Sequence, residues 1–254
     1  MRQPGLSFFI LLIIFLLGTL VGSIILNLII YNRANLYYRE LNKVRLDPLD
    51  LSRYPVNSNL PKPENNQKRV VFFGDSRAES WPVPRLPDYE FINRGIGGQT
   101  SVQINQRFEQ HLRSLQPDVV VIQLGINDLK TIGLFPGRKS EIIANCRQNI
   151  GDIVQKSREL GAAVIITTIF PFGEVPLARK PFWSDDIFPA VQEVNAYIKS
   201  LADEGVIVFD TLPILADDRG MMLPEYRVDE LHYNQQAYEQ LNQEFTELLK
   251  SLKL

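Results

Sequence analysis

An unbroken apolar segment near the N-terminus places the strongest constraint on how this chain can fold. From Leu6 to Tyr31 there is no charged residue, and nearly every position is apolar. As a helix rising about 1.5 Å per residue, the segment would be roughly 39 Å long, enough to cross a hydrocarbon core about 30 Å thick with some tilt. A helix packed on a soluble domain would show a polar face, which this segment lacks. The sequence therefore predicts a transmembrane anchor over residues 6–31, preceded by a short tail over residues 1–5.

The alternative for this segment is a cleaved secretory signal, whose apolar region would be only about 7–15 residues long and would end at small residues. Gly18, Gly22 and Ser23 could form such a site, but apolar sequence continues beyond them, which favours an uncleaved, single-pass anchor. More basic residues follow the span than precede it, and counted literally they would keep the next domain in the cytoplasm. Single N-terminal anchors nevertheless commonly hold enzymes outside, and we expect an extracytoplasmic domain.

A polar connector over residues 32–68 separates the anchor from the rest of the chain. Its first half is charged and could continue as a helix to about Asp47. Its second half carries several prolines among Asn and Ser, which is typical of an extended linker. Residues 69–254 remain, about 186 positions, which is enough for one domain with a full hydrophobic core.

Composition disfavours several classes of protein. The formal net charge of −2 gives no indication of a nucleic-acid-binding face. The single cysteine, Cys146, excludes an intrachain disulfide and a cysteine-based zinc cluster, and we expect it to be buried in a helix. The two histidines, His111 and His232, are too few for a histidine-rich metal site. His111 lies among polar residues and is predicted to be solvated.

In the predicted domain, short apolar runs alternate with amphipathic runs. Apolar, β-branched runs are typical of parallel strands covered on both faces, and they occur at Val70–Gly74, Tyr89–Asn93, Val119–Leu124, Ala163–Ile169 and Val206–Phe209. Helical stretches follow at about Ser101–Leu115, Ser140–Leu160, Ile187–Asp203 and Asn234–Leu252. This alternation predicts right-handed βαβ units in an open, doubly wound sheet, whose active site lies beyond the carboxyl ends of the strands.

Four polar motifs stand at the positions where such a sheet would carry its site. They are Gly74–Arg77 (GDSR) after the first strand, Asn93–Thr100 (NRGIGGQT) after the second, Gly125–Asp128 (GIND) after the third, and Asp229–His232 (DELH) before the last helix. Each motif alone fits a turn, a tight connection or a helix cap. Because the four arrive in order and each can fill a different role, we interpret them together as an acyl-transfer centre.

Three residues can supply the nucleophile and its base. A serine hydroxyl is a poor nucleophile until a neighbouring base removes its proton, so Ser76 is predicted to act with His232. Asp229 can reach the other ring nitrogen, fix the tautomer and stabilise the imidazolium. The developing oxyanion needs preorganised donors. The backbone N–H groups of Ser76 and Gly98 and the side-chain amide of Asn127 are the candidates.

Together these residues resemble the four signature blocks of the SGNH hydrolase superfamily, also called GDSL lipases and esterases. The resemblance covers about residues 69–254, and all four namesake residues match: Ser76, Gly98, Asn127 and His232. It implies a three-layer α/β/α, flavodoxin-like fold with a five-stranded parallel sheet. It also implies hydrolysis of an ester or thioester through an acyl-serine intermediate, with no cofactor. The run Asn-Arg-Gly-Ile-Gly-Gly is similar to the branch of platelet-activating-factor acetylhydrolase-like and lysophospholipase-like esterases.

Three residues depart from the family's usual pattern. Arg77 stands where the motif name has Leu, at a position that varies. Gln99 replaces an Asp that often follows the second-block glycine, which could alter how that loop is anchored. Ala237 replaces a common Gly in the last helix, where we expect only packing to change. None of the three removes a predicted catalytic role.

The stretch Pro171–Pro189 is rich in proline and aromatic residues and follows the fourth strand at the predicted catalytic edge. Phe172, Phe182 and Trp183 are therefore candidates for lining an acyl pocket or for resting against a membrane. Packing of the loop onto its own domain explains the same residues equally well.

The sequence thus predicts a membrane-anchored serine esterase or lipase for a small-molecule or lipid ester, of lysophospholipase or acetylesterase type. An acyltransferase or deacylase acting on envelope glycans would use the same centre. A dinucleotide-binding module is disfavoured because Thr100 occupies the last glycine position of its fingerprint. No serine lies in the Gly-x-Ser-x-Gly elbow of α/β-hydrolases. A non-catalytic, membrane-tethered binding module would leave the matched motifs unexplained.

Overall fold

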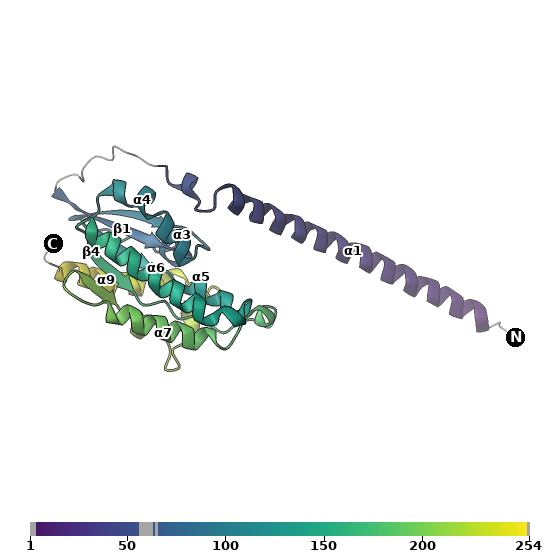
Figure 1. Cartoon of the computed structure of the whole chain (residues 1–254). Helices are drawn as coiled ribbons and strands as arrows, with labels where there is room; N and C mark the ends of the chain where they lie inside the picture. Colours follow the sequence, from purple (N-terminus) through teal and green to yellow (C-terminus); the bar gives the residue numbers. More distant parts are fainter. Residues whose placement is uncertain (1–3, 56–62, 64–65, 253–254) are drawn as a thin grey trace. The chain divides into compact units, whose positions relative to one another are not determined.

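The structure, a computed structural model, describes residues 4–55, 63 and 66–252 (Figure 1). Contacts between residues divide the chain into two compact units, Met1–Pro48 and Leu49–Leu254. Residues 1–3 of the predicted tail, and residues 56–62 and 64–65 of the predicted linker, lie outside the described residues.

The first unit contains one long helix, α1, which runs from Pro4 to Leu46. Its side chains from Leu6 to Tyr31 are exposed, and its most apolar window has a mean hydropathy of 2.9. Within the described residues it is the one helix long and apolar enough to cross a membrane, a test that a secretory signal also passes. The helix continues through the charged half of the predicted connector and ends close to Asp47, as the sequence indicated.

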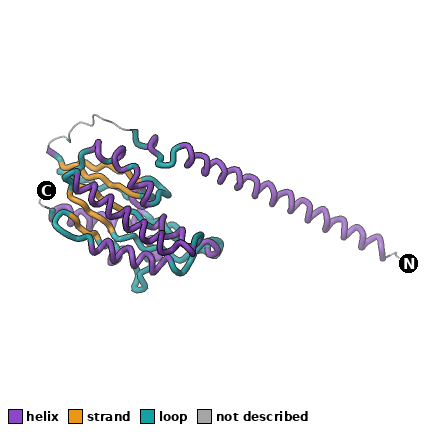
Figure 2. The backbone as a smooth tube through the Cα atoms, viewed as in Figure 1, coloured by secondary structure: helices purple, strands orange, loops and turns teal. Residues whose placement is uncertain are grey.

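The second unit is built on a parallel sheet of five strands in the order β2-β1-β3-β4-β5. The strands are β1 Lys68–Gly74, β2 Tyr89–Gly95, β3 Val119–Gln123, β4 Ala163–Thr167 and β5 Val206–Phe209. Every neighbouring pair is parallel, so each connection crosses the sheet as βαβ units require (Figure 2). The order changes direction at β1, and residues that follow β1 and β3 therefore meet at a crevice.

Helices cover both faces of this sheet (Figure 1). One face carries α3 Ser101–Gln106, α4 Phe108–His111, α6 Lys139–Glu159 and α7 Ile187–Ser200, and the other carries α8 Leu212–Leu215 and α9 Gln235–Ser251. Two short helices, α2 Ser76–Glu79 and α5 Ile126–Leu129, start just beyond the carboxyl ends of β1 and β3. Short 3-10 turns occur at Leu51–Arg53, Arg113–Leu115, Lys130–Gly133, Pro136–Arg138, Lys180–Phe182 and Pro224–Tyr226.

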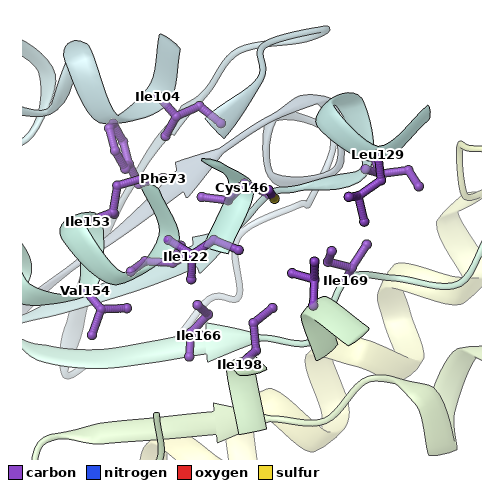
Figure 3. Packing of buried hydrophobic residues seen from close by; sticks show 14 of the residues in the cluster. Phe73, Ile104, Ile122, Leu129, Cys146, Ile153, Val154, Ile166, Ile169 and Ile198 are labelled. Atoms are coloured by element: carbon purple, nitrogen blue, oxygen red, sulfur yellow. The ribbon is translucent and has the colours of Figure 1, made fainter. Parts of the chain in front are cut away.

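Alternation of side chains along the strands builds two hydrophobic cores. In β1, Val71 and Phe73 belong to the core under α3, α4, α6 and α7, whereas Val70 and Phe72 belong to the core under α9. Figure 3 shows side chains of the first core, among them Phe73, Ile122, Cys146 and Ile198. One core on each face of a five-stranded parallel sheet confirms the predicted three-layer α/β/α fold.

One predicted helix is interrupted. The segment Ser101–Leu115 forms α3, α4 and a 3-10 turn in place of a single helix. The break falls at Arg107, whose backbone leaves the helical region (φ −87°, ψ 3°) and whose guanidinium donates to the carbonyl of Gly74 (2.9 Å). His111 follows this break and is only 2% exposed, so the prediction that it is solvated is wrong.

Candidate active site

Ser76 stands at the sharp turn from β1 into α2. Gly74 ends the strand, and a Cβ there would lie 1.8 Å from the carbonyl oxygen of Gln123 on β3, so no larger residue fits. Asp75 caps α2 by accepting the backbone N–H of Arg77 (2.9 Å), which makes Ser76 the first helical residue. The sequence therefore presents the Ser76 hydroxyl at the carboxyl edge of the sheet.

The structure brings Ser76, His232 and Asp229 together from separate parts of the chain. Nε2 of His232 is 3.2 Å from Oγ of Ser76, and Nδ1 is 2.8 Å from Oδ2 of Asp229. The side chains of His232 and Asp229 are 43% and 37% exposed, so the pair can be reached from solvent. In this arrangement a carboxylate can fix the imidazole tautomer while the imidazole takes a proton from the hydroxyl.

The carboxylate of Asp229 is held in its charged form. Partial burial raises its pKa, but the hydrogen bond from His232 and the backbone N–H groups of Leu231 and His232 outweigh burial, so the pKa lies below its ordinary value. A charged Asp229 keeps the proton on Nδ1 and leaves Nε2 free to accept the proton of Ser76.

The three predicted oxyanion donors lie at the same edge. Ser76 opens α2, and N–H groups in the first turn of a helix have no partner within it. Gly98 has a left-handed φ of +76°, which favours glycine, and a Cβ built there would meet no described atom within 4 Å. The loop is therefore open at Gly98. Asn127, in α5, is buried, with 4% of it exposed.

Two hydrogen bonds orient the side chain of Asn127. Its Nδ2 donates to the carbonyl of Gln99 (3.0 Å), and its Oδ1 accepts Nζ of Lys130 (2.6 Å). An ammonium group can only donate, so Lys130 fixes which end of the amide carries the NH₂ group. Burial lowers the pKa of Lys130, and the charge of Asp75 acts in the opposite direction. Lys130 was not predicted, because a lysine just after a polar motif reads as an exposed turn residue.

A buried arginine holds the loop that carries His232. Arg77 is 0% exposed, and its guanidinium donates to the backbone carbonyls of Leu231 (3.0 Å), Phe170 (2.7 Å) and Pro171 (3.4 Å). It therefore ties the His232 loop to the segment that follows β4. In the sequence, this position is a variable one of the family motif, and nothing in the local pattern indicates that the side chain is buried.

Two buried carboxylates support the site. Burial raises the pKa of Asp75 to about 6 and also raises the pKa of Asp128. Asp128 accepts the backbone N–H (2.8 Å) and the hydroxyl (2.6 Å) of Ser101, the first residue of α3. Both carboxylates thus hold backbone in place. Among the described residues, no group of three or more His, Cys, Asp or Glu side chains is placed to hold a metal ion.

The loop Pro171–Pro189 packs against the His232 loop. The N–H of Gly173 donates to the carbonyl of Glu230 (2.8 Å), and Arg179 forms an ion pair with the Glu230 carboxylate. An open depression of about 740 Å³ in this loop is lined by Phe172 and Trp183, whose ring centroids are 5.2 Å apart. Phe182 is 61% exposed and is not among the lining residues. The structure therefore brings two of the three predicted aromatic residues together.

Comparison with known proteins identifies the family. Residues 69–240 match the model of the GDSL-like Lipase/Acylhydrolase family, and the chain belongs to that family. The matched region contains all five residues that the four motifs singled out: Ser76, Gly98, Asn127, Asp229 and His232.

Two curated relatives share shorter stretches with this chain. YqeF of Bacillus subtilis (strain 168), described as a lipoprotein, is 28% identical over 122 residues, which cover 41% of this chain and 49% of YqeF. Esterase TesA of Pseudomonas aeruginosa is 34% identical over 82 residues, which cover 32% of this chain and 37% of TesA. The chain thus spans less than half the length of either relative.

Solved structures share the fold over most of the chain. A protein of Bacteroides fragilis NCTC 9343, assigned as an acylhydrolase, is 28% identical with a TM-score of 0.66, covering 81% of this chain and 98% of that one. A GDSL-like lipase of Bacteroides thetaiotaomicron VPI-5482 is 24% identical with a TM-score of 0.62, covering 80% and 98%. These likenesses, with the family match, confirm the fold and the family indicated by the four motifs.

Proposed function

We propose that this chain is a membrane-anchored serine esterase that hydrolyses a carboxylic ester through an acyl-serine intermediate. The observation that carries the proposal is the run of contacts from Oγ of Ser76 to Nε2 of His232 (3.2 Å) and from Nδ1 of His232 to Asp229 (2.8 Å). Membership of a lipase and acylhydrolase family and the likeness to Esterase TesA support the same class of reaction.

In the first half of the reaction, Nε2 of His232 takes the proton of Ser76 as Oγ attacks the ester carbonyl carbon. A C–O bond forms to Oγ, the carbonyl electron pair moves to oxygen, and Asp229 stabilises the imidazolium. The imidazolium then protonates the alcohol oxygen as its bond to carbon breaks, which leaves the acyl-serine. Water, deprotonated by His232, attacks this ester in turn. The imidazolium then returns the proton to Oγ as its bond to carbon breaks, which releases the acid and restores Ser76 and neutral His232.

We propose that hydrogen bonds stabilise the negative charge on the oxygen of the tetrahedral intermediate. The donors are the N–H groups of Ser76 and Gly98 and Nδ2 of Asn127. Lys130 supports the last of these, because it binds Oδ1 of Asn127 and so fixes the direction of the NH₂ group. Donors that are fixed before the reaction stabilise the transition state without a cost of reorientation.

The substrate is proposed to be a small-molecule or lipid ester that contacts the depression at Phe172 and Trp183. In support, the wall of this depression is bonded to the His232 loop through Gly173 and Glu230. Phe182 is proposed as a further, exposed contact beside it. Hydrolysis of p-nitrophenyl esters with short and long acyl chains, compared with acetate release from an acetylated glycan, decides between a lipid-type esterase and a glycan deacylase or acyltransferase.

The anchor is proposed to be residues 6–31 of α1, uncleaved. Residues 32–68 connect it to the hydrolase domain of residues 69–254, which is proposed to lie on the extracytoplasmic side. The description of the relative YqeF as a lipoprotein supports a membrane association. Protease added to intact cells should degrade the hydrolase domain. Protection of the domain until the cells are broken would place it in the cytoplasm.

The reaction itself is tested with a fluorophosphonate, which should label the full-length protein once, at Ser76. Labelling should require His232, because the imidazole takes the proton of Ser76 as the hydroxyl attacks. A Ser76→Ala protein that is still labelled, or that hydrolyses esters at the wild-type rate, would refute the proposal.

A further inference from the structure

Residues Leu49–Tyr54, hereafter the strap, pack on the domain that contains Ser76, although the sequence assigned them to an extended linker. They begin the second compact unit and contain the 3-10 turn Leu51–Arg53. The strap lies upstream of residues 69–240, which the family model matches. Its contacts are therefore particular to the part of this chain that joins α1 to the domain.

Two backbone carbonyls of the strap accept hydrogen bonds from buried side chains. Nε2 of Gln99 donates to the carbonyl of Leu49 (2.8 Å), and Nε2 of His111 lies 3.3 Å from the carbonyl of Leu51. Arg107 donates to Oε1 of Gln99 (2.5 Å) and lies 3.4 Å from Nδ1 of His111. Since a guanidinium only donates, Nδ1 accepts in a neutral His111, and Nε2 carries the proton that reaches Leu51.

Tyr54 contacts the other end of the loop that carries Gly98. Its hydroxyl donates to the carbonyl of Gly95 (2.8 Å). The guanidinium of Arg94 lies 4.7 Å from the centre of its ring, and the ring of His111 meets it edge-on at 5.6 Å. The side chain of Tyr54 is thus held on three sides, which fixes the hydroxyl beside Gly95.

Arg53 adds a contact to the helix that Ser76 opens. It forms an ion pair with Glu79 of α2. Oε2 of Glu79 lies against Gly97, where a Cβ would approach it to 2.9 Å. The pair is partly exposed and weak by itself, but it connects the strap to a third point of the same loop.

These contacts bracket Gly98. Gly95 and Gln99 are the two ends of the loop, and both are bonded to the strap. Gly98 itself has open space around the position of a Cβ. The tip of the loop is therefore not packed in place, and the position of its N–H depends on how the two ends are held.

We propose that the strap is a positioning segment of the oxyanion hole. By holding Gly95 and Gln99, it places the N–H of Gly98 and the carbonyl of Gln99 that accepts Asn127. The inference rests on the proposed esterase function. A strap that served only stability would change the folded fraction and leave turnover per folded molecule unaltered. A positioning segment lowers kcat of the folded enzyme and leaves KM nearly unchanged.

Two variants of the full-length protein in detergent test this role. Tyr54→Ala removes the bond to Gly95. Gln99→Glu keeps an acceptor for Arg107 but loses the donor to Leu49. Removing an oxyanion donor lowers kcat by about 10²–10³, and a displaced donor costs less, so we expect kcat to fall about ten-fold with KM within about two-fold. Tyr37→Ala is the matched control, because Tyr37 is 68% exposed on α1 and should leave kcat unchanged.

A double-mutant cycle asks whether the strap acts through Gly98. Gly98→Ala strains the loop at its positive φ, so a following Tyr54→Ala should lower kcat by clearly less than it does alone. Asp229→Asn acts on the imidazole and not on the loop. In an Asp229→Asn background, Tyr54→Ala should therefore lower kcat by the same factor as it does alone. Thermal unfolding of each variant gives the folded fraction.

The outcomes separate the two proposals. A wild type that neither hydrolyses esters nor reacts with a fluorophosphonate at Ser76 overturns both. An active wild type with an equally active Tyr54→Ala overturns the strap proposal alone. So does a loss that follows the folded fraction, a change confined to KM, or a Tyr54→Ala factor that is the same with and without Gly98→Ala.

Discussion

The two loops beside Ser76 are held by different parts of the chain. The Asp229–His232 loop is fixed from within the domain, because Asp229 accepts its backbone N–H groups and the buried Arg77 binds its carbonyl at Leu231. The Gly95–Gln99 loop is bonded at both of its ends by the strap, in addition to the bonds that Gln99 makes with Arg107 and Asn127 inside the domain. All the contacts named for the acid–base half of the proposed site (Ser76, His232 and Asp229) come from the family domain. In the oxyanion half (Ser76, Gly98 and Asn127), the strap proposal makes the placement of Gly98 depend on residues upstream of that domain.

The largest effect should come from breaking the acid–base half. Ser76→Ala and His232→Ala should each lower kcat by about 10⁴–10⁶, and the double variant should be scarcely worse, because nucleophile and base act in one step. Asp229→Asn should leave more activity than either, since Asp229 orients the imidazole without reacting. Steady-state kcat of the four proteins checks this. If the two single losses multiply in the double variant, Ser76 and His232 do not act in one step.

Breaking the oxyanion half should cost less. Asn127→Ala should lower kcat by about 10²–10³, or about 2.7–4 kcal/mol of transition-state stabilisation, with little change in KM. The measurement is a full saturation curve for one ester. A change in KM alone would make Asn127 an ordinary substrate contact.

Asp75 precedes Ser76, and its effect should appear in stability. Burial raises its pKa from 3.8 to about 6, so the folded state binds this proton more tightly than the unfolded chain does. The folded state is therefore most stable below the ordinary pKa of an aspartate, and its stability falls as pH rises towards about 6. The shift corresponds to about 3 kcal/mol. Asp75→Asn, which can still accept the N–H of Arg77, should gain stability over wild type between pH 4 and 7 in denaturant unfolding. A constant difference across that range would contradict the assignment.

The smallest effect is expected at Lys130, which orients Asn127 in the oxyanion half of the site. Lys130→Met removes the donor to Oδ1 of Asn127 and should lower kcat several-fold, because the amide can then turn. Lys130→Arg keeps a donor and should recover most of the activity. Ester hydrolysis by both variants, at matched folded fraction, is the measurement. If Lys130→Met and Lys130→Arg lose the same amount of activity, the shape of the ammonium group matters and the orientation of the amide does not.

The fold could be predicted because buried parallel strands leave a pattern that does not depend on their partners. The apolar runs predicted all five strands, although β4 ends at Thr167 and β2 extends to Gly95. The break in Ser101–Leu115 could not be predicted. The break falls at Arg107, whose guanidinium donates to the carbonyl of Gly74, and no local pattern signals that contact.

The candidate site was predicted as motifs, and the structure places Ser76, His232 and Asp229 within hydrogen-bond distance. What holds the motifs was not predicted. The composition of the strap is that of a linker. Its bonds to Gln99 and His111 are made by backbone carbonyls, which every residue has, so the sequence does not reveal them. The roles of Lys130 and Arg77 were not predicted for a related reason: they depend on burial, which distant elements provide.

The docking of the strap also shortens the tether of the enzyme. A flexible linker over residues 32–68 would let a domain sample distances of roughly 33 Å from its anchor. Between the end of α1 at Leu46 and the first strap residue only Asp47 and Pro48 remain, and two residues span at most about 7 Å. The stretch of chain that joins α1 to the second compact unit is therefore two residues long, in place of the long extended linker that the sequence indicated.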